Sequence, residues 1–401
     1  MPSIFQINVT ANSGSTGRIA EQINMMAGKS GWKTYLAYGR NVQPCQSELI
    51  HIGNMLQVYE HYAEHRLFDN DGLASRLATR QLIGKIMEIK PDVIHLHNIH
   101  DHWLNYRILF DYLNTLDTPI VWTQHDCWSF TGFCGHYTMM NCDKWRTTCD
   151  SCPMKKHRFE KTRKHFLLKK ELFSATKNMV LTPVSHWLES QLKESFLKHH
   201  PIRPILNGVD IDVFHPIDSI LVRKKYGISD SPYLVACATS WSTRKGLKDY
   251  IALSKIIDKG VKIVLVGLSE KQIEQISPYG IVCIPRTESV LELAALYSGA
   301  EIVMNLSYEE TFGLTTVEGF ACGTPSIVYN STASPELITS ETGIVVAPGD
   351  IEAVSSAVGQ IMKVGKKNFS SACRMRAETN YNKNDRYNDY VNLYEELMGK
   401  K

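Results

Sequence analysis

The chain has 401 residues, 43% of them hydrophobic, and a formal net charge of +3. This length is too great for one ordinary core and predicts about two domains, and the balanced charge does not favour nucleic acid as a partner. No apolar run approaches the ~20 residues that span a bilayer, and residues 1–9 are too short for a signal peptide. We therefore expect a cytoplasmic protein, a setting in which disulfides are rare.

Apolar segments with strand character alternate with segments of helical spacing along both halves of the chain. In the first half we expect strands at 4–9, 33–39, 93–96, 120–123 and 180–182 and helices at 18–29, 73–90, 105–116 and 185–198. In the second half we expect strands at 233–238, 262–266, 281–284, 302–304 and 326–329 and helices at 247–259, 270–276, 289–298 and 386–398, with one more starting near 312. This alternation predicts parallel sheets covered by helices on both faces.

The run of residues 201–216 contains three prolines and an Asn-Gly pair, a composition typical of a connector. We expect an N-terminal domain at 1–205 and a C-terminal domain at 206–384. Two such sheets bind ligands at the carboxyl ends of their strands. The fold class is therefore α/β, with two doubly wound Rossmann-like domains that face each other across a cleft.

Residues 305–325 form the most informative segment. Glu310 and Glu318 would lie about 12 Å apart on one helix. That exceeds the roughly 5–9.5 Å between the carboxylates of a glycosidase. A helix start near Phe312 and Gly313 would favour a phosphate between them. The pattern predicts a sugar-nucleotide site, with Glu310 on sugar hydroxyls and Glu318 on the ribose. A solvated glutamate face on an amphipathic helix is the alternative.

This E-x7-E segment, which ends at Gly-Thr-Pro (residues 323–325), resembles the donor-site signature of retaining glycosyltransferases of the GT-B fold, family four. The likeness covers nearly the whole chain, although Thr311 stands where that family usually has glycine. It implies a UDP- or GDP-linked sugar donor and transfer that needs no divalent metal. It also implies that the tail helix, about 385–401, returns to the N-terminal domain.

Arg244 and Lys245 follow the strand expected at 233–238. Fixed cations there would stabilise the charge of a departing nucleoside diphosphate, and the resemblance makes this pair a diphosphate clamp. A solvated basic pair is the alternative. The resemblance also implies that residues 311–313 offer backbone amides to the donor. Arg286 stands where family members hold the nucleotide base.

Gly14 and Gly17 lie in a small-residue loop after the first expected strand, without the G-x-G-x-x-G spacing of a dinucleotide site. The resemblance places this loop over the donor diphosphate and beside the acceptor, and an ordinary turn is the alternative. His125 follows the strand at 120–123 and could donate a hydrogen bond to the donor sugar or the transferring centre. A buried, satisfied histidine is the alternative, and we expect Asp126 to orient its neighbours.

A cysteine-rich insert spans about residues 127–153. Cys134, Cys142, Cys149 and Cys152 have spacings of x7, x6 and x2, which suit a tetrahedral structural zinc. Unlinked thiols and disulfides are the alternatives. The insert resembles one in colanic-acid-type polysaccharide transferases, where it borders the acceptor side.

Four histidines also cluster near the strand expected at 93–96, namely His95, His97, His100 and His102. Similar transferases have a histidine-rich strand end here without a metal, so we expect none at this position.

Lys155 to Lys170 contains eight Lys or Arg residues and one acid, Glu160, with apolar residues between them, among them Phe159. Such a basic helix could lie on an anionic membrane surface, with about 1 kcal/mol per cation, near a lipid-linked acceptor. A solvated helix face is the alternative. We expect no nucleic acid here, because the other charges of the chain balance.

Taken together, these features predict a retaining glycosyltransferase that moves a sugar to a glycan or lipid-linked saccharide in surface polysaccharide biosynthesis. We expect peripheral association with the inner face of the cell membrane. A nucleotide-sugar epimerase of the same fold and a non-catalytic sugar-nucleotide-binding scaffold are the alternatives.

Overall fold

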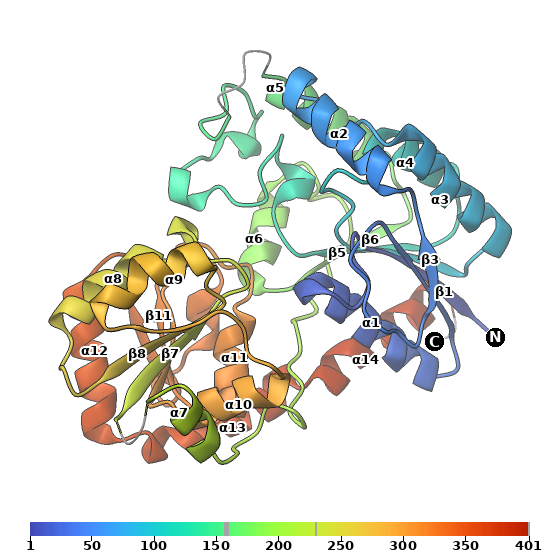
Figure 1. The fold of residues 1–401 in the computed structure, drawn as a ribbon. Coiled ribbons are helices and arrows are strands. Elements are labelled where there is room, and N and C mark those ends of the chain that lie inside the picture. The colour runs from blue at the N-terminus through green and yellow to red at the C-terminus, as the bar shows by residue number, and fades with distance from the viewer. Residues whose placement is uncertain (156–159, 229–230, 400–401) are drawn as a thin grey trace. The chain divides into compact units, whose positions relative to one another are not determined.

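The computed structural model of the protein describes residues 1–155, 160–228 and 231–399 (Figure 1). The chain forms two compact units. Unit 1 consists of residues 1–206 together with 387–401, and unit 2 consists of residues 207–386. The expected boundaries, after residues 205 and 384, lie close to these positions. Figure 1 shows helices on both sides of the sheet in each unit.

Unit 1 contains a parallel sheet of six strands in the order β3-β2-β1-β4-β5-β6. The strands are β1 (Ser3–Ile7), β2 (Lys33–Tyr38), β3 (Glu48–His51), β4 (Val93–Leu96), β5 (Ile120–Gln124) and β6 (Met179–Pro183). The helices are α1 (Gly14–Lys29), α2 (Met55–Phe68), α3 (Arg76–Ile89), α4 (Tyr106–Leu113), α5 (Thr162–Ser174) and α6 (His186–Glu194). The last helix, α14 (Lys383–Leu397), carries the chain from unit 2 back into unit 1.

One part of the core of unit 1 forms where α1 and α14 pack together on the sheet. Ile19 and Ile23 of α1 lie in one cluster with Tyr390 and Tyr394 of α14 and with apolar residues of β1, β4, β5 and β6. Figure 1 shows α14 beside α1. Every residue of β4, β5 and β6 is buried, as expected of strands covered on both faces.

Unit 2 contains a second parallel sheet of six strands, in the order β12-β11-β10-β7-β8-β9. The strands are β7 (Tyr233–Cys237), β8 (Lys262–Val266), β9 (Val282–Ile284), β10 (Ile302–Asn305), β11 (Ser326–Tyr329) and β12 (Gly343–Val346). The helices are α7 (Ile220–Lys225), α8 (Leu247–Ile256), α9 (Glu270–Ile276), α10 (Val290–Gly299), α11 (Leu314–Ala321), α12 (Ile351–Val364) and α13 (Lys367–Tyr381). One of its apolar clusters joins residues of α8 and α12 to the sheet.

The two sheets share one strand order when each is numbered from its own first strand. In both, the chain adds strands outward from the first strand on one side, then crosses to add strands on the other. The order reverses between β1 and β4 in unit 1 and between β7 and β10 in unit 2. These switch points, at the carboxyl ends of the strands, are where open α/β sheets bind ligands.

The structure differs from the sequence prediction at two helix starts. The loop expected at 12–17 is largely helical, because α1 begins at Gly14. Its small first-turn residues have low helix propensity, but the apolar face from Ile19 to Ala27 packs on the sheet and outweighs it. The helix expected from Phe312 begins at Leu314. Glu310 therefore lies in the preceding loop, and the 12 Å estimate for a continuous helix does not apply.

Candidate active site

The switch point of unit 2 joins two loops. A 3-10 turn at Thr243–Lys245 follows β7, and the loop 306–313 follows β10, the neighbouring strand. The Tyr308 amide donates to the Arg244 carbonyl at 2.8 Å. Gly246 has φ +69°, and a Cβ there would lie 2.1 Å from the Leu306 carbonyl oxygen. Only glycine fits at this contact, so the two loops are held together by their backbones.

This contact brings Arg244, Lys245 and Glu310 into one cluster. The Lys245 ammonium forms an ion pair with Oε1 of Glu310, and these side chains are 20% and 15% exposed. Nη1 of Arg244 donates to the Glu309 carbonyl at 3.0 Å. Burial raises the pKa of Glu310. Lys245, the Ser307 hydroxyl and Arg244 together lower the pKa by more than burial raises it, so the pKa falls below its ordinary value. The cluster thus presents two cations beside an ionised carboxylate.

The loop from Thr311 to Gly313 leads into α11. Gly313 is buried with φ +102°, and Leu337 and Asn305 lie 3.1 and 3.4 Å from where its Cβ would be. The Phe312 ring is buried edge-on against Tyr381, with centroids 5.7 Å apart. Because this ring is part of the packing, Phe312 can offer a ligand its backbone rather than its side chain.

Glu318 and Arg286 lie on other elements than Arg244, Lys245 and Glu310. Glu318, on α11, accepts a hydrogen bond from the Tyr297 hydroxyl of α10 at 3.1 Å. Arg286 is exposed and follows β9, and β8 separates that strand from β7. The ribose and base contacts expected of these two residues stay predictions.

In unit 1, two histidines lie at the carboxyl ends of neighbouring strands. His97 follows β4 and His125 follows β5, and Nδ1 of His97 lies 2.9 Å from Nε2 of His125. Nε2 of His97 lies 2.5 Å from Oε1 of Gln6 on β1. Burial lowers the pKa of His97 well below its usual range and that of His125 to about 4. Both rings are therefore neutral at pH 7.

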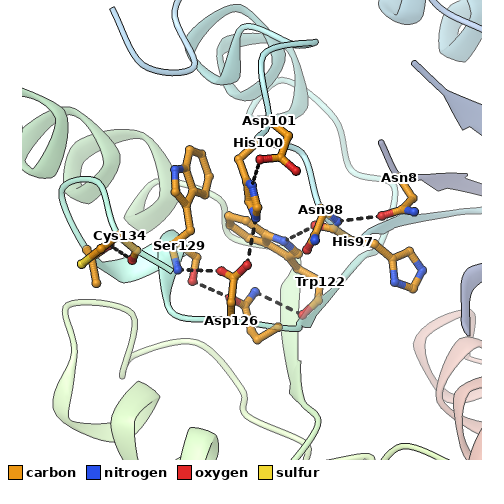
Figure 2. A network of polar contacts seen from close by, with 12 residues as sticks. Asn8, His97, Asn98, His100, Asp101, Trp122, Asp126, Ser129 and Cys134 are labelled. Atoms are coloured by element: carbon orange, nitrogen blue, oxygen red, sulfur yellow. Dashed lines mark hydrogen bonds and ion pairs between the residues drawn. The ribbon is translucent and has the colours of Figure 1, made fainter. Parts of the chain in front are cut away.

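The next residue, Asp126, forms a charged pair beside these neutral rings. Figure 2 shows His100 between Asp101 and Asp126. Nε2 of His100 lies 3.0 Å from Oδ2 of Asp126, whose Oδ1 accepts from the Trp128 amide at 2.8 Å. Burial lowers the pKa of His100, but the two carboxylates outweigh it and raise that pKa to about 10. Asp126 thus orients His100 and the start of the insert.

His95 is part of the core. Its Nδ1 lies 2.6 Å from the Tyr394 hydroxyl of α14, and its Nε2 lies 2.7 Å from the Thr123 hydroxyl. Within residues 1–155, 160–228 and 231–399, no three His, Cys, Asp or Glu side chains are grouped so as to hold a metal ion.

The cysteine insert is also without a group of metal ligands in the part of the chain that the structure describes. Cys134, Cys142, Cys149 and Cys152 are free thiols and near neighbours: burial first, and then the other cysteines, raise the pKa of Cys134 to about 12. They are not grouped as metal ligands, so the structure does not display the tetrahedral arrangement that their spacing suggests. A zinc held by these thiols stays a prediction.

Gly14 and Gly17 occupy the first turn of α1. A Cβ on Gly17 would lie 2.5 Å from the Thr10 hydroxyl, so close packing explains this glycine. Gly14 has φ +67° and nothing within 4 Å of its Cβ position. Gly14 is therefore the one of the two with open space for a ligand.

The basic stretch at 155–170 falls partly outside the described residues, which omit 156–159 with Phe159. Lys155 is buried in an ion pair with Asp69. Lys169 is also buried and donates to the carbonyls of Trp128 and Thr131 at 2.8 and 3.1 Å. These two lysines therefore cannot face a lipid surface. Exposed cations of α5 are Arg163, Lys164 and Lys170, and membrane contact through them stays a prediction.

Gln6, Tyr297 and Asn24 of α1 take part in these sites but were not singled out from the sequence. Oδ1 of Asn24 accepts a hydrogen bond from Nε2 of Gln6 at 2.7 Å. Gln6 is a polar residue within an apolar strand, and its exposure is 0%. A buried amide needs hydrogen-bond partners, so its position was a usable signal. Asn24 carried no comparable signal, because polar residues are ordinary on an amphipathic helix such as α1, and Tyr297 carried none, because it lies within the mostly apolar helix α10.

Comparison with known proteins gives two family matches. Residues 33–213 match the model described as Glycosyltransferase Family 4, and residues 218–380 match Glycosyl transferases group 1. Together they cover most of both units.

Single relatives agree with these matches. The chain is 29% identical over 164 residues to a putative colanic acid biosynthesis glycosyl transferase, WcaC, of Escherichia coli K12, covering 38% of this chain and 39% of that protein. The chain spans about half the length of the curated relatives it matches.

Solved structures share the fold. Sucrose-phosphate synthase from Thermosynechococcus elongatus has a TM-score of 0.76 at 17% identity, over 100% of both chains. Anabaena HepE in complex with UDP has a TM-score of 0.66 at 14% identity, over 99% of this chain and 100% of that one. The two sheets and these likenesses define a GT-B protein.

The chain belongs to the family-four glycosyltransferases. No helix in the described part of the chain is long and apolar enough to cross a membrane.

Proposed function

We propose that the protein is a retaining glycosyltransferase that moves a sugar from a nucleoside-diphosphate sugar to a glycan or lipid-linked saccharide in surface polysaccharide biosynthesis. The observation that carries this proposal is the cluster of Arg244, Lys245 and Glu310 at the switch point of unit 2. The cluster combines cations for a diphosphate with a carboxylate for sugar hydroxyls, on a chain of the glycosyltransferase family.

The two cations would act on the leaving group. As the bond from the sugar C1 to the diphosphate oxygen breaks, negative charge grows on that oxygen, and Arg244 and Lys245 would stabilise it more than the intact donor. The backbone amides from Thr311 to Gly313 and the start of α11 would add further donors. With fixed cations in these roles, we propose that transfer needs no divalent metal.

Glu310 would hold the sugar. Its lowered pKa keeps it ionised, so it accepts hydrogen bonds from hydroxyls and does not serve as a general acid. Lys245 is its partner in the structure, and an incoming diphosphate would give the ammonium a second anion. Glu318 would contact the ribose, Arg286 the base, and Gly14 would leave room for phosphate and acceptor.

The acceptor would enter on the face that the diphosphate leaves. Its hydroxyl oxygen forms the new bond to C1 while its proton passes to the departing phosphate oxygen, so the configuration at C1 is kept. We assign no protein nucleophile. The likeness to the putative colanic acid biosynthesis glycosyl transferase of Escherichia coli supports a polysaccharide setting, and the UDP complex of HepE supports a nucleotide-sugar donor.

A panel of UDP-, GDP- and ADP-sugars tests the proposal. We expect slow release of nucleoside diphosphate from one donor without acceptor, and unchanged release after EDTA treatment. Recovery of an altered sugar still attached to its nucleotide would indicate an epimerase instead. Donor binding without any turnover, across the whole panel and with saccharide acceptors present, would indicate a scaffold and refute the proposal.

A further inference from the structure

A chain of buried hydrogen bonds runs through unit 1 from a fixed starting point. Nδ2 of Asn24 lies 3.3 Å from the Tyr35 carbonyl oxygen, which can only accept a hydrogen bond. The same Nδ2 donates at 3.0 Å to the Ser47 hydroxyl, whose own proton goes to Glu21. Both contacts require the amide nitrogen of Asn24 on that side, so its oxygen faces the other way.

Gln6 receives its orientation from Asn24. Oδ1 of Asn24 accepts from Nε2 of Gln6 at 2.7 Å, so the oxygen of Gln6 is the atom that faces His97. Gln6 is 0% and Asn24 1% exposed, and neither can turn without leaving a buried polar atom unpaired. Oε1 of Gln6 accepts only, and therefore Nε2 of His97, 2.5 Å away, carries the proton.

The position of the proton on His97 in turn fixes the position of the proton on His125. His97 is buried and neutral, so with its proton on Nε2 its Nδ1 has only a lone pair. Nδ1 of His97 accepts from Nε2–H of His125 at 2.9 Å. His125 is neutral as well, which leaves its Nδ1 without a proton.

His125 is the partly exposed end of this chain. Among the described residues, its ring is hydrogen-bonded to His97 alone, so Nδ1 is left for a ligand. Its position directly after β5 places it at the carboxyl edge of the sheet, two strands from β1. A lone pair there suits a hydroxyl group and disfavours a carbonyl or a phosphate oxygen, neither of which has a proton to give.

We infer that Gln6 and His97 are positioning residues that hold His125 in the Nε2–H tautomer, so that Nδ1 of His125 accepts a hydrogen bond from a sugar hydroxyl. This inference rests on the proposed function for the identity of the ligand, but the tautomer itself does not. It reverses the sequence prediction, in which His125 donates.

The tautomer can be measured without turnover. We would label the full chain with 15N-histidine and record long-range 1H–15N spectra at pH 7, assigning His97 and His125 from single His→Gln variants. We expect both rings as Nε2–H tautomers. A protonated Nδ1 on His125 would overturn the inference, whatever the enzyme assays show.

Gln6→Met tests this chain of hydrogen bonds from Gln6 through His97 to His125, the relay. It removes the acceptor that faces Nε2 of His97, so nothing fixes the proton of that ring and we expect a mixture of His125 tautomers. Gln275→Met, at an exposed position of α9, is the matched control and should leave the His125 signals unchanged. If Gln6→Met does not fold, Gln6→Leu serves, with the same mixture expected. A single unchanged tautomer in the folded variant would refute the role of Gln6.

The ligand is tested with modified donors. From the donor that turns over, each sugar hydroxyl is replaced in turn by hydrogen and by fluorine, which cannot donate. At the hydroxyl that contacts His125, we expect both replacements to lower kcat/KM about tenfold in the wild type and little in His125→Ala. Equal losses in both proteins at every position would refute the contact. Absence of turnover with all unmodified donors would instead refute the proposed function and leave the tautomer result standing.

Discussion

The two switch points share a topology but differ in charge. In unit 2, the loops that follow β7 and β10 bring Arg244, Lys245 and Glu310 into one cluster of charged side chains. In unit 1, the sheet places Gln6, His97 and the neighbouring His125 at the equivalent edge, all neutral. The ionic cluster can respond to a charge that grows during a reaction. The neutral relay can discriminate only by which partner gives the proton.

Burial accounts for this difference. The Lys245–Glu310 pair keeps 20% and 15% of its side-chain surface in contact with solvent, whereas Gln6 and His97 are 0% and 1% exposed. Charges lose much of their hydration free energy when they are fully buried, and amides and neutral imidazoles lose less. The deeply buried site in unit 1 therefore uses neutral groups whose hydrogen bonds have a fixed donor and acceptor. The more exposed site in unit 2 uses charged groups.

The largest effect should come from removing the ionic character of unit 2. If the proposed function holds, we expect Lys245→Ala to lower kcat about 10²–10³-fold, because the leaving diphosphate would lose a fixed cation. Stability should change by about 1 kcal/mol or less, since the ion pair is partly exposed. Steady-state release of nucleoside diphosphate and thermal unfolding measure the two effects. Lys248→Ala, an exposed lysine three residues on, is the control, and equal activity of the two variants would contradict the assignment.

Lowering the pH should destabilise unit 1 more than unit 2. Burial lowers the pKa values of His61, His125 and His200 to about 4, below the ~6.5 of an unfolded histidine. Between pH 6.5 and 4, the unfolded chain binds protons that these folded rings do not, so stability falls as pH falls. The slope is on the order of 1 kcal/mol per pH unit for each ring.

His100 works in the opposite direction. Its raised pKa contributes stability that is fully present below pH 6.5 and is lost as the pH rises through about 10. Because all of the shifted histidines lie in unit 1, hydrogen exchange at pH 7 and 5 should show amides of β4 and β5 losing more protection than those of β7 and β8. Equal losses would show that the histidines of unit 1 are not held neutral.

A smaller effect should follow from separating the loops of unit 2. Gly246 and Gly227 have similar φ values, +69° and +64°, but only a Cβ on Gly246 would meet another atom, the Leu306 oxygen. Each change to alanine should cost about 1 kcal/mol for the left-handed backbone. Gly246→Ala should lose about 1–3 kcal/mol more from overpacking, together with activity. Urea unfolding of the two variants gives the difference, and equal values would mean that the Leu306 contact is not tight.

Local patterns predicted the ionic site better than the relay. Arg244 and Lys245 follow a recognisable strand, and Glu310 belongs to a contiguous motif, so neighbouring parallel strands were enough to bring them together. The relay joins Gln6 to His97 across 91 residues and depends on which way two buried amides turn, and no local pattern encodes that. The helix α2 was missed because only His61 of its side chains is buried, so it lacks an apolar stripe.

The return of α14 to unit 1 has a consequence for the order of folding during synthesis. Tyr387, Tyr390 and Tyr394 help to cover β1, β4 and β5, yet the ribosome makes them only after the whole of unit 2. Domains usually fold as they emerge, N-terminal first. Here one apolar face of the unit 1 sheet stays uncovered until α14 has been synthesised. Unit 2 can therefore complete its core before unit 1 does. Nascent chains stalled near residue 386 should therefore be the species that chaperones protect.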